Sequence, residues 1–182
     1  MSNFHSHGSG KYKIKDFKKI GKNVVIEPGV LIFHPENIEI GDNVYIGHYT
    51  ILKGYYKNKL KIGSNTFISQ FCFLHGSADL EIGDNVGIRP GVMIFGSPHD
   101  LSKDDLGPIN KLPLKIEPIK IEEGCDIGIG AIILGGVIIS RGTQVGAGAV
   151  VTKTTKPNSI VVGVPARILR MRKGLKLRNI KK

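Results

Sequence analysis

The residue of this sequence best suited to proton transfer is His99, in the segment IFGSPHD over 94–100. An imidazole with its ordinary pKa of about 6.5 is mostly neutral at pH 7, yet basic enough to accept a proton. His99 stands among Gly, Ser and Pro, where a regular hydrophobic pattern breaks off. From the residues alone it is either a catalytic base or an ordinary loop histidine.

The two cysteines, Cys72 and Cys125, lie far apart and form no C-x-x-C motif. A disulfide framework or a thiolate zinc site is therefore poorly supported. We expect no metal in this protein.

Composition bounds the fold class. The chain has 182 residues, 24 Gly, no Trp and 41% hydrophobic residues, which favours many short strands and turns within one domain. No apolar run approaches the roughly 18 residues of a membrane span, and the polar start MSNFHSHGSG does not resemble a signal peptide. These features predict a soluble cytoplasmic protein with no membrane span.

The net charge of +11 is one-sided, because residues 127–182 contain no Asp or Glu. Most of the surplus cations lie in ARILRMRKGLKLRNIKK over 166–182. Such a segment indicates an anionic partner, namely phosphate, nucleic acid or a lipid headgroup. A merely solvated basic tail is the alternative for the residues past Gly174.

A six-residue repeat organises the chain: IGDNVY over 40–45 is followed by IGHYTI over 46–51. This period is not helical and fits a short strand plus a turn, so three units close a triangular coil. Stacked coils would pair at a strand spacing of about 4.8 Å, which predicts an all-β parallel β-helix of about six to seven coils. The recurring Ile, Leu or Val stand at positions 20, 26, 32; 40, 46, 52; 62, 68, 74; 82, 88, 94; 121, 127, 133; and 139, 145, 151.

The position four residues after each aliphatic should also point inward, because side chains alternate along a strand. It holds small or β-branched residues and both cysteines, as a narrow prism requires. We therefore expect the cysteines to serve core packing. The column consists of Val24, Val30, Val44, Thr50, Thr66, Cys72, Val86, Val92, Cys125, Ala131, Val137, Thr143 and Ala149.

The coils begin at 20, 40, 62, 82, 121, 139 and 157, so every insertion follows the third repeat and leaves one corner of the prism. The fourth insertion is a long excursion over 95–119 that begins with the His99 segment; loops of such length are usually functional or disordered. We predict an N-terminal segment over 1–19, a β-helix domain over 20–165 and a basic C-terminal helix and tail over 166–182. The short helix, ended by Gly174, would cap the open end of the prism.

Three further motifs narrow the assignment: SPHD over 97–100 with the following PI and KIEPIKI, VGAGAVVTK over 145–153, and GVPARILR over 163–170. With the repeats, they make the chain resemble the hexapeptide-repeat acyltransferases, and most of all the O-acetyltransferases of sugars and surface polysaccharides. The resemblance covers about residues 20–173. It implies a left-handed parallel β-helix, a homotrimer with active sites between subunits, and a role in polysaccharide biosynthesis.

The resemblance also implies chemistry. His99 would act as general base, removing the proton of an acceptor that attacks the thioester of acetyl-CoA in a ternary complex, and a backbone N–H would stabilise the oxyanion. The acceptor would be a small-molecule sugar or nucleotide sugar. In the sugar acetyltransferases an Asn occupies the position of Ser69, so Ser69 and Gln70 are candidate substrate contacts. His75 could share their pocket from one coil below the excursion, or be a solvent-facing corner residue.

By the same resemblance, acetyl-CoA would lie along the last coils as co-substrate. Backbone groups near Gly128, Ile129, Ala147 and Ala149 would hold the pantetheine, where small residues let the chain approach closely, and three cations would face the phosphates. Asp126 stands where the family often has an aromatic residue beside the pantetheine. The predicted cofactor-binding residues are Gly128, Ile129, Ala147, Ala149, Lys153, Arg167 and Arg170.

Several alternatives stay open. N-acylation of a nucleotide-linked amino sugar would use the same base and cofactor, and the opening coils also resemble such enzymes. A γ-class carbonic anhydrase shares the prism but needs zinc histidines spaced H-x-x-x-x-H, and no two of the histidines at 5, 7, 34, 48, 75 and 99 are five apart. A nucleic-acid-binding β-helix would need interleaved aromatics, which the basic tail lacks.

Overall fold

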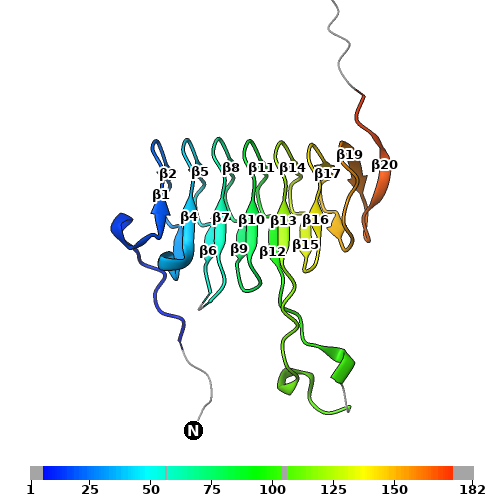
Figure 1. The fold of residues 1–182 in the computed structure, drawn as a ribbon, viewed down its shortest axis with the longest axis horizontal. Coiled ribbons are helices and arrows are strands. Elements are labelled where there is room, and N and C mark those ends of the chain that lie inside the picture. The colour runs from blue at the N-terminus through cyan, green and yellow to red at the C-terminus, as the bar shows by residue number, and fades with distance from the viewer. Residues whose placement is uncertain (1–5, 56, 104–105, 174–182) are drawn as a thin grey trace, which may run out of the picture.

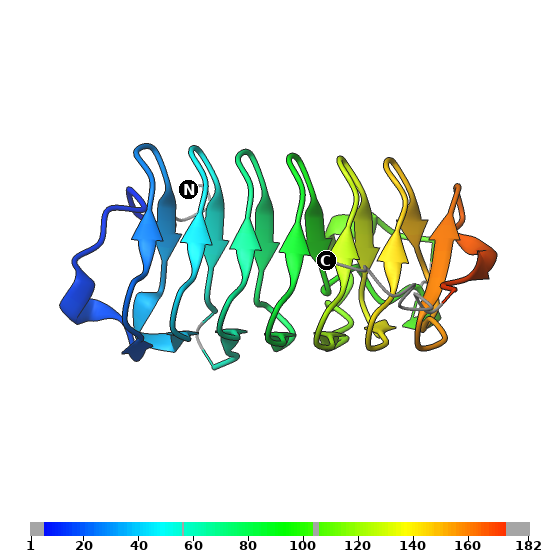
Figure 2. The ribbon, with the colours of Figure 1, turned by 90° about the horizontal axis from the view of Figure 1, so that it is seen from above.

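The computed structural model describes residues 6–55, 57–103 and 106–173. The strands form coils stacked along one axis, with the N-terminal segment at one end and the last strands at the other (Figures 1 and 2). Six complete coils of three strands are followed by part of a seventh. The predicted all-β parallel β-helix is confirmed.

Each coil contributes one strand to each of three sheets, which we name A, B and C. Sheet A contains β1 (Lys19–Ile20), β4 (Ile38–Ile40), β7 (Leu60–Ile62), β10 (Leu80–Ile82), β13 (Ile119–Ile121) and β16 (Ile138–Ile139). Sheet B contains β2 (Val25–Ile26), β5 (Tyr45–Ile46), β8 (Phe67–Ile68), β11 (Gly87–Ile88), β14 (Asp126–Ile127), β17 (Gln144–Val145), β19 (Ser159–Val162) and β20 (Arg167–Met171). Sheet C contains β3 (Leu31–Phe33), β6 (Ile51–Lys53), β9 (Phe73–His75), β12 (Met93–Phe95), β15 (Ile132–Leu134) and β18 (Val150–Val151).

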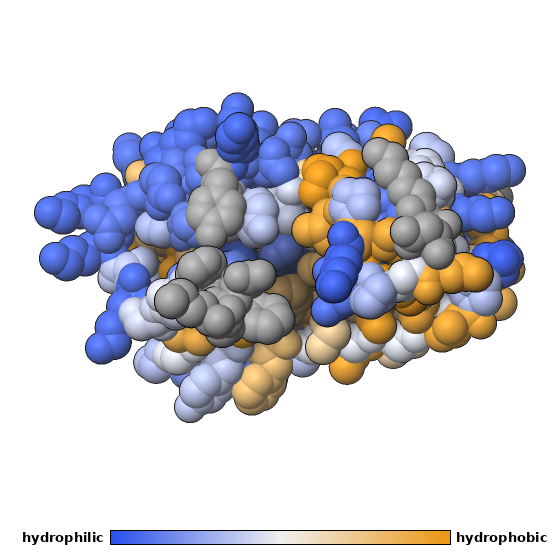
Figure 3. All heavy atoms as spheres, turned by 90° about the horizontal axis from the view of Figure 1, so that it is seen from below, coloured by the Kyte–Doolittle hydropathy of each residue, from blue (hydrophilic) through white to orange (hydrophobic). Residues whose placement is uncertain are grey.

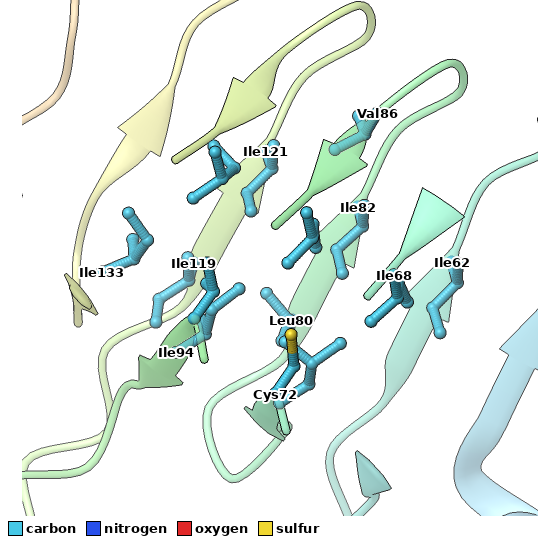
Figure 4. Close-up of a cluster of buried hydrophobic side chains, with 14 of the residues drawn as sticks. Ile62, Ile68, Cys72, Leu80, Ile82, Val86, Ile94, Ile119, Ile121 and Ile133 are labelled. Carbon is cyan, nitrogen blue, oxygen red and sulfur yellow. The ribbon is translucent and has the colours of Figure 1, made fainter. Parts of the chain in front are cut away.

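The register follows the six-residue period. Ile40, Ile62, Ile82, Ile121 and Ile139 align across sheet A, and their side chains are almost wholly buried. Figure 4 shows Ile62, Ile82 and Ile121 side by side, turned toward the same interior as Cys72. Both predicted inward columns are buried from the second coil onward; Val24, Ile20 and Ile26 in the first coil are only partly covered.

The turns between strands use left-handed backbone at repeated positions. At the corner between sheets A and B, Asn23, Asn43 and Asn65 have φ near +55°, and their amides form a ladder with N···O distances of 3.0 and 3.1 Å. Asn tolerates this conformation well. At the corner between sheets B and C, the corresponding residue is Gly in four coils, namely Gly29, Gly91, Gly130 and Gly148.

The C-terminal end differs from the prediction. Residues 167–171 form β20, which pairs antiparallel with β19, so the predicted helix over 166–182 is wrong for these residues. The last parallel strand would otherwise leave a row of unpaired backbone groups, and a returning strand satisfies them where a helix would not. Residues 174–182, including the expected helix end at Gly174, lie outside the described residues.

Four short 3₁₀ helices complete the elements of the described residues: Ile14–Asp16, Pro35–Asn37, Leu101–Lys103 and Ile109–Lys111.

No helix within the described ranges has the length and apolar character needed to cross a membrane.

Both cysteines lie in the core with free thiols, as their column predicts. Burial raises the pKa of both thiols, that of Cys125 to about 11. A thiol held protonated and inaccessible is a poor nucleophile.

The burial of both cysteines predicts slow labelling of the native protein. We expect a thiol-reactive disulfide dye to leave the folded protein unlabelled over a time in which it reacts with both thiols of the denatured chain. Rapid labelling of the native protein would contradict this packing.

Candidate active site

The fourth insertion folds as an arm on the corner between sheets C and A, leaving the prism after β12 and returning to β13 (Figure 1). The two legs of the arm run side by side, and His99 and Leu114 form an antiparallel bridge between them. Backbone hydrogen bonds join the legs from Glu117 N to Gly96 O (2.9 Å), Lys115 N to Pro98 O (2.8 Å) and Asp100 N to Pro113 O (2.8 Å).

The arm is anchored where it leaves the prism. The hydroxyl of Ser77 donates to that of Ser97 at 2.8 Å, and both side chains are buried. A Cβ on Gly96 would stand 2.5 Å from the carbonyl oxygen of Glu117, so only glycine fits between the legs. The arm is therefore held to the prism at Ser97, two residues before His99.

One ring nitrogen of His99 makes a hydrogen bond within the arm. Its Nδ1 lies 2.9 Å from the carbonyl oxygen of Leu112. A carbonyl can only accept, so Nδ1 carries the proton and Nε2 presents a lone pair. Asp100 does not orient the ring: its Oδ1 accepts from the backbone N–H and the hydroxyl of Ser102, at 3.1 and 2.6 Å. The orienting group is a backbone carbonyl, which no side-chain motif could have revealed.

His75 occupies a different environment. It pairs with Phe95 in the register of sheet C, and its ring stacks on those of Phe73 and Phe95, with centroids 5.5 and 4.9 Å away. Only 7% of the residue is exposed, so the expected alternative of a solvent-facing corner does not hold. His99 stands four residues beyond Phe95, about 13 Å along the extended leg. The structure thus places His75 within sheet C and His99 on the arm.

Burial and the nearby Lys53 ammonium lower the pKa of His75 to about 4, and its buried Nδ1 has no hydrogen-bond partner. The imidazole therefore stays neutral where an exposed one would be partly charged.

Ser69 and Gln70 lie at the corner between sheets B and C, in the turn from β8 to β9. Ser69 is 4% exposed and its carbonyl oxygen accepts from the Thr50 hydroxyl at 2.9 Å; Gln70 is exposed. His99 belongs to the corner between sheets C and A. Within one chain, the candidate base and the candidate substrate contacts are therefore on different corners.

The predicted pantetheine residues line the corner between sheets B and C, two or three coils further on. A Cβ on Gly128 would stand 2.6 Å from the backbone nitrogen of Ala147, so these turns need glycine to stack closely. Ile129 and Ala147 are exposed. Ala149 is fully buried and its N–H already donates to Gly146 O at 3.2 Å, which leaves that group unavailable to a ligand.

Arg167 and Arg170 are brought to one face by an irregularity in β20. The register shifts between Ile160 and Val161, so Arg167 stands opposite Val162 and Arg170 opposite Ile160. Side chains alternate along β19, so Ile160 and Val162 lie on the same side of the strand, opposite Val161, and their partners Arg170 and Arg167 share that side. Ile160 is itself buried, whereas both arginines are exposed. Lys153 and Arg167 also line a cleft of about 270 Å³ with Ala166 and Ile168. The cleft and the two arginines make the last coils a cationic surface.

Comparison with known proteins places the chain in a family. It is 33% identical to the galactoside O-acetyltransferase of Escherichia coli over 178 residues, which are 91% of this chain and 72% of that protein. The chain belongs to the hexapeptide-repeat acyltransferases. With this membership, the predicted left-handed winding and the prediction of an acyltransferase are confirmed. No family model matches the sequence.

Solved structures of other acyltransferases agree. A mutant of AntD, an N-acyltransferase from Bacillus cereus in complex with dTDP and coenzyme A, superposes with a TM-score of 0.78 at 30% identity, covering 89% of this chain and 91% of its own. The hexapeptide-repeat acetyltransferase VCA0836 from Vibrio cholerae gives 0.65 at 27% identity, covering 87% and 76%. Within the described residues of this acyltransferase, no cluster of three or more His, Cys, Asp or Glu is arranged to hold a metal ion.

The depressed pKa of His75 predicts acid sensitivity. Between about pH 4 and 6.5 the unfolded chain binds a proton at this residue and the folded protein does not, so stability falls as the pH is lowered. From pH 7 to 5 we expect His75 to account for a loss of about 2 kcal/mol in the free energy of unfolding. Urea denaturation of wild type and His75→Phe at both pH values measures this contribution.

The matched control is His34→Asn, which removes a half-buried histidine from a left-handed position that Asn tolerates. This variant should keep the wild-type loss, whereas His75→Phe should lose less. Equal losses in all three proteins would contradict a neutral His75.

Proposed function

We propose that this acyltransferase moves an acetyl group from acetyl-CoA to a hydroxyl of a sugar or surface-polysaccharide precursor, with His99 as general base. The contact between His99 Nδ1 and the Leu112 carbonyl carries the proposal, since it leaves Nε2 free to accept a proton. The galactoside O-acetyltransferase, similar over most of the chain, supports the acyl donor and the sugar acceptor.

In the reaction, the acceptor oxygen attacks the thioester carbon while its proton passes to His99 Nε2. A tetrahedral intermediate forms, and collapse breaks the carbon–sulfur bond. The imidazolium then returns the proton to the departing CoA sulfur. No acyl-enzyme is needed, and the buried thiols of Cys72 and Cys125 cannot supply one.

We propose a homotrimer in which each active site lies between two prisms. The chain places His99 on one corner and Ser69, Gln70 and the pantetheine track on another, so a second copy would complete each site. The arm supports this assembly because it carries exposed aliphatic side chains that a partner would cover, namely Leu101, Leu106, Ile109, Leu114 and Ile116. Figure 3 shows hydrophobic surface gathered on the side from which the arm projects, toward the C-terminal coils.

In this arrangement CoA lies along the corner between sheets B and C with its phosphates at Lys153, Arg167 and Arg170. The shared face of the two arginines suits several phosphate groups, which planar guanidinium ions bind in pairs of hydrogen bonds. Small residues at Gly128 and Ala147 would let the pantetheine approach the backbone. The AntD structure, which holds coenzyme A, supports the cofactor.

N-acylation of a nucleotide-linked amino sugar is the second candidate. AntD has been crystallised with dTDP-4-amino-4,6-dideoxyglucose, and that structure superposes with a TM-score of 0.78 at 31% identity. The same lone pair on His99 would accept a proton from an amine. A panel of sugars and amino nucleotide sugars, assayed by release of CoA thiol, distinguishes the two acceptors.

Removal of the base tests the mechanism. His99→Ala should lower kcat by roughly 100- to 10,000-fold and leave the KM for acetyl-CoA within about twofold, because general-base catalysis acts on the chemical step. The thiol-release assay measures both constants. His34→Asn, which exchanges a half-buried histidine on a turn, should match wild type. Near wild-type turnover by His99→Ala would refute the assignment.

The two β20 arginines should act on cofactor binding instead. Arg167→Ala and Arg170→Ala should each raise the KM for acetyl-CoA by about tenfold or more, because a charge-assisted hydrogen bond contributes about 1.5–3 kcal/mol. Their effect should weaken as salt screens the exposed charges. Arg141→Ala, which removes an exposed arginine from the corner between sheets A and B, is the control. Unchanged KM values in both β20 variants would place the phosphates elsewhere.

A further inference from the structure

Two exposed aromatic side chains stack on each other at the corner between sheets B and C. Tyr49 and Phe71, in the second and third coils, are 61% and 60% exposed, with ring centroids 5.5 Å apart and planes 9° from parallel. We call this pair the aromatic ledge. Its rings make no part of the buried core, so packing inside the prism does not explain them.

The backbone beneath the ledge is unfavourable for these residue types. Tyr49 and Phe71 have φ of 58° and 59°, in the left-handed region, where four other coils place glycine. A bulky residue in this conformation is uncommon, and such outliers cluster at functional sites. The Tyr49 ring also covers Gly29, where an added Cβ would stand 2.5 Å from Tyr49 Cδ1, so local packing accounts for part of that ring. The remaining exposed ring surface of the pair lies outside the core, which indicates binding.

The position of the ledge indicates which ligand it meets. On the next coils the equivalent residues are Gly91, Gly130 and Gly148, and a Cβ built on the last two would meet nothing within 4 Å. From Phe71 toward the last coils, this column therefore carries no side chains of its own, and the exposed Ile129 borders it beside the proposed pantetheine residues. If CoA enters from the cationic end, its thioester points toward the ledge, and the acceptor must lie there.

Polar groups suited to hydroxyls surround the ledge. The Glu27 carboxylate lies 3.6 Å from His48 Nε2. Burial and the charge of Glu27 raise the pKa of the Tyr45 hydroxyl, which keeps it protonated. Gln70 is the residue before Phe71. Carboxylate, imidazole and amide groups can bond several hydroxyls, while an aromatic face covers the apolar C–H face of a sugar ring. This combination fits a carbohydrate better than a wholly apolar ligand.

We propose that the aromatic ledge is the acceptor subsite, on which a pyranose ring of the acceptor packs against the exposed ring surface of Tyr49 and Phe71. The inference rests on the proposed function, since it assigns the sugar to the end of the CoA track. It identifies these two residues as determinants of acceptor affinity with no part in proton transfer.

Glycine substitutions test the ledge without harming the fold, because glycine already fills this position in four coils. Phe71→Gly and Tyr49→Gly should each raise the KM for the sugar acceptor by roughly tenfold and leave the KM for acetyl-CoA unchanged. Thermal unfolding should show no loss of stability. Asn85→Gly makes the same exchange at an exposed left-handed residue of another corner and should match wild type.

Titration calorimetry with methyl β-galactoside and methyl α-glucoside tests the ledge independently of turnover. Wild type should bind at least one glycoside, and Phe71→Gly should bind it roughly tenfold more weakly. Equal binding by both proteins, or by neither, would overturn the proposal. So would binding of dTDP or UDP that needs Phe71 while glycosides do not, or a change in oligomeric mass of Phe71→Gly in light scattering. A wild type that binds glycosides but releases no CoA thiol would refute the proposed function alone.

Discussion

The stacking of coils in register is the constraint on which everything else in this molecule depends. Each sheet must bring one aliphatic residue per coil to the same height, as Ile40, Ile62, Ile82, Ile121 and Ile139 do in sheet A. A slip by one residue would turn a whole strand's core side chain outward. Insertions are therefore confined to corners, and so are the groups that could act on a substrate.

Confinement to corners explains why the candidate base and the other candidate site residues of one chain lie apart, as the proposed trimer requires. The arm carries His99 away from the corner between sheets C and A, while the glycine track and the ledge belong to the corner between sheets B and C. A rigid prism cannot fold one corner onto another. Association of copies is the economical way to bring such groups together, and the exposed aliphatic residues of the arm suit that role.

The fold could be predicted well from the sequence because the six-residue period recurs in every coil. The same period correctly placed both cysteines among the inward-pointing residues. It failed where tertiary context outweighs local pattern. Residues 167–171 have the composition of a helix, yet β19 offers an open edge that a strand satisfies better. His75 occupies an outward-facing strand position, but Phe73 and Phe95 on adjacent positions bury its ring. The Leu112 carbonyl that orients His99 carries no sequence signal at all.

The aromatic ledge shows that a repetitive core tolerates an unfavourable backbone conformation in individual coils. A bulky residue in left-handed backbone lowers the free energy of unfolding by roughly 1–2 kcal/mol. In a small domain with one compact core, this loss would destabilise the whole domain. In a stack of similar coils each coil contacts only its neighbours, so the cost at Tyr49 and Phe71 stays local and the other coils keep their own stabilising contacts. Strain can therefore persist in the second and third coils without loosening the base of the arm, where Ser77 and Ser97 hold the legs. The anchor of the arm and the strained backbone of the ledge thus lie on different corners, although Ser77 and Phe71 belong to the same coil.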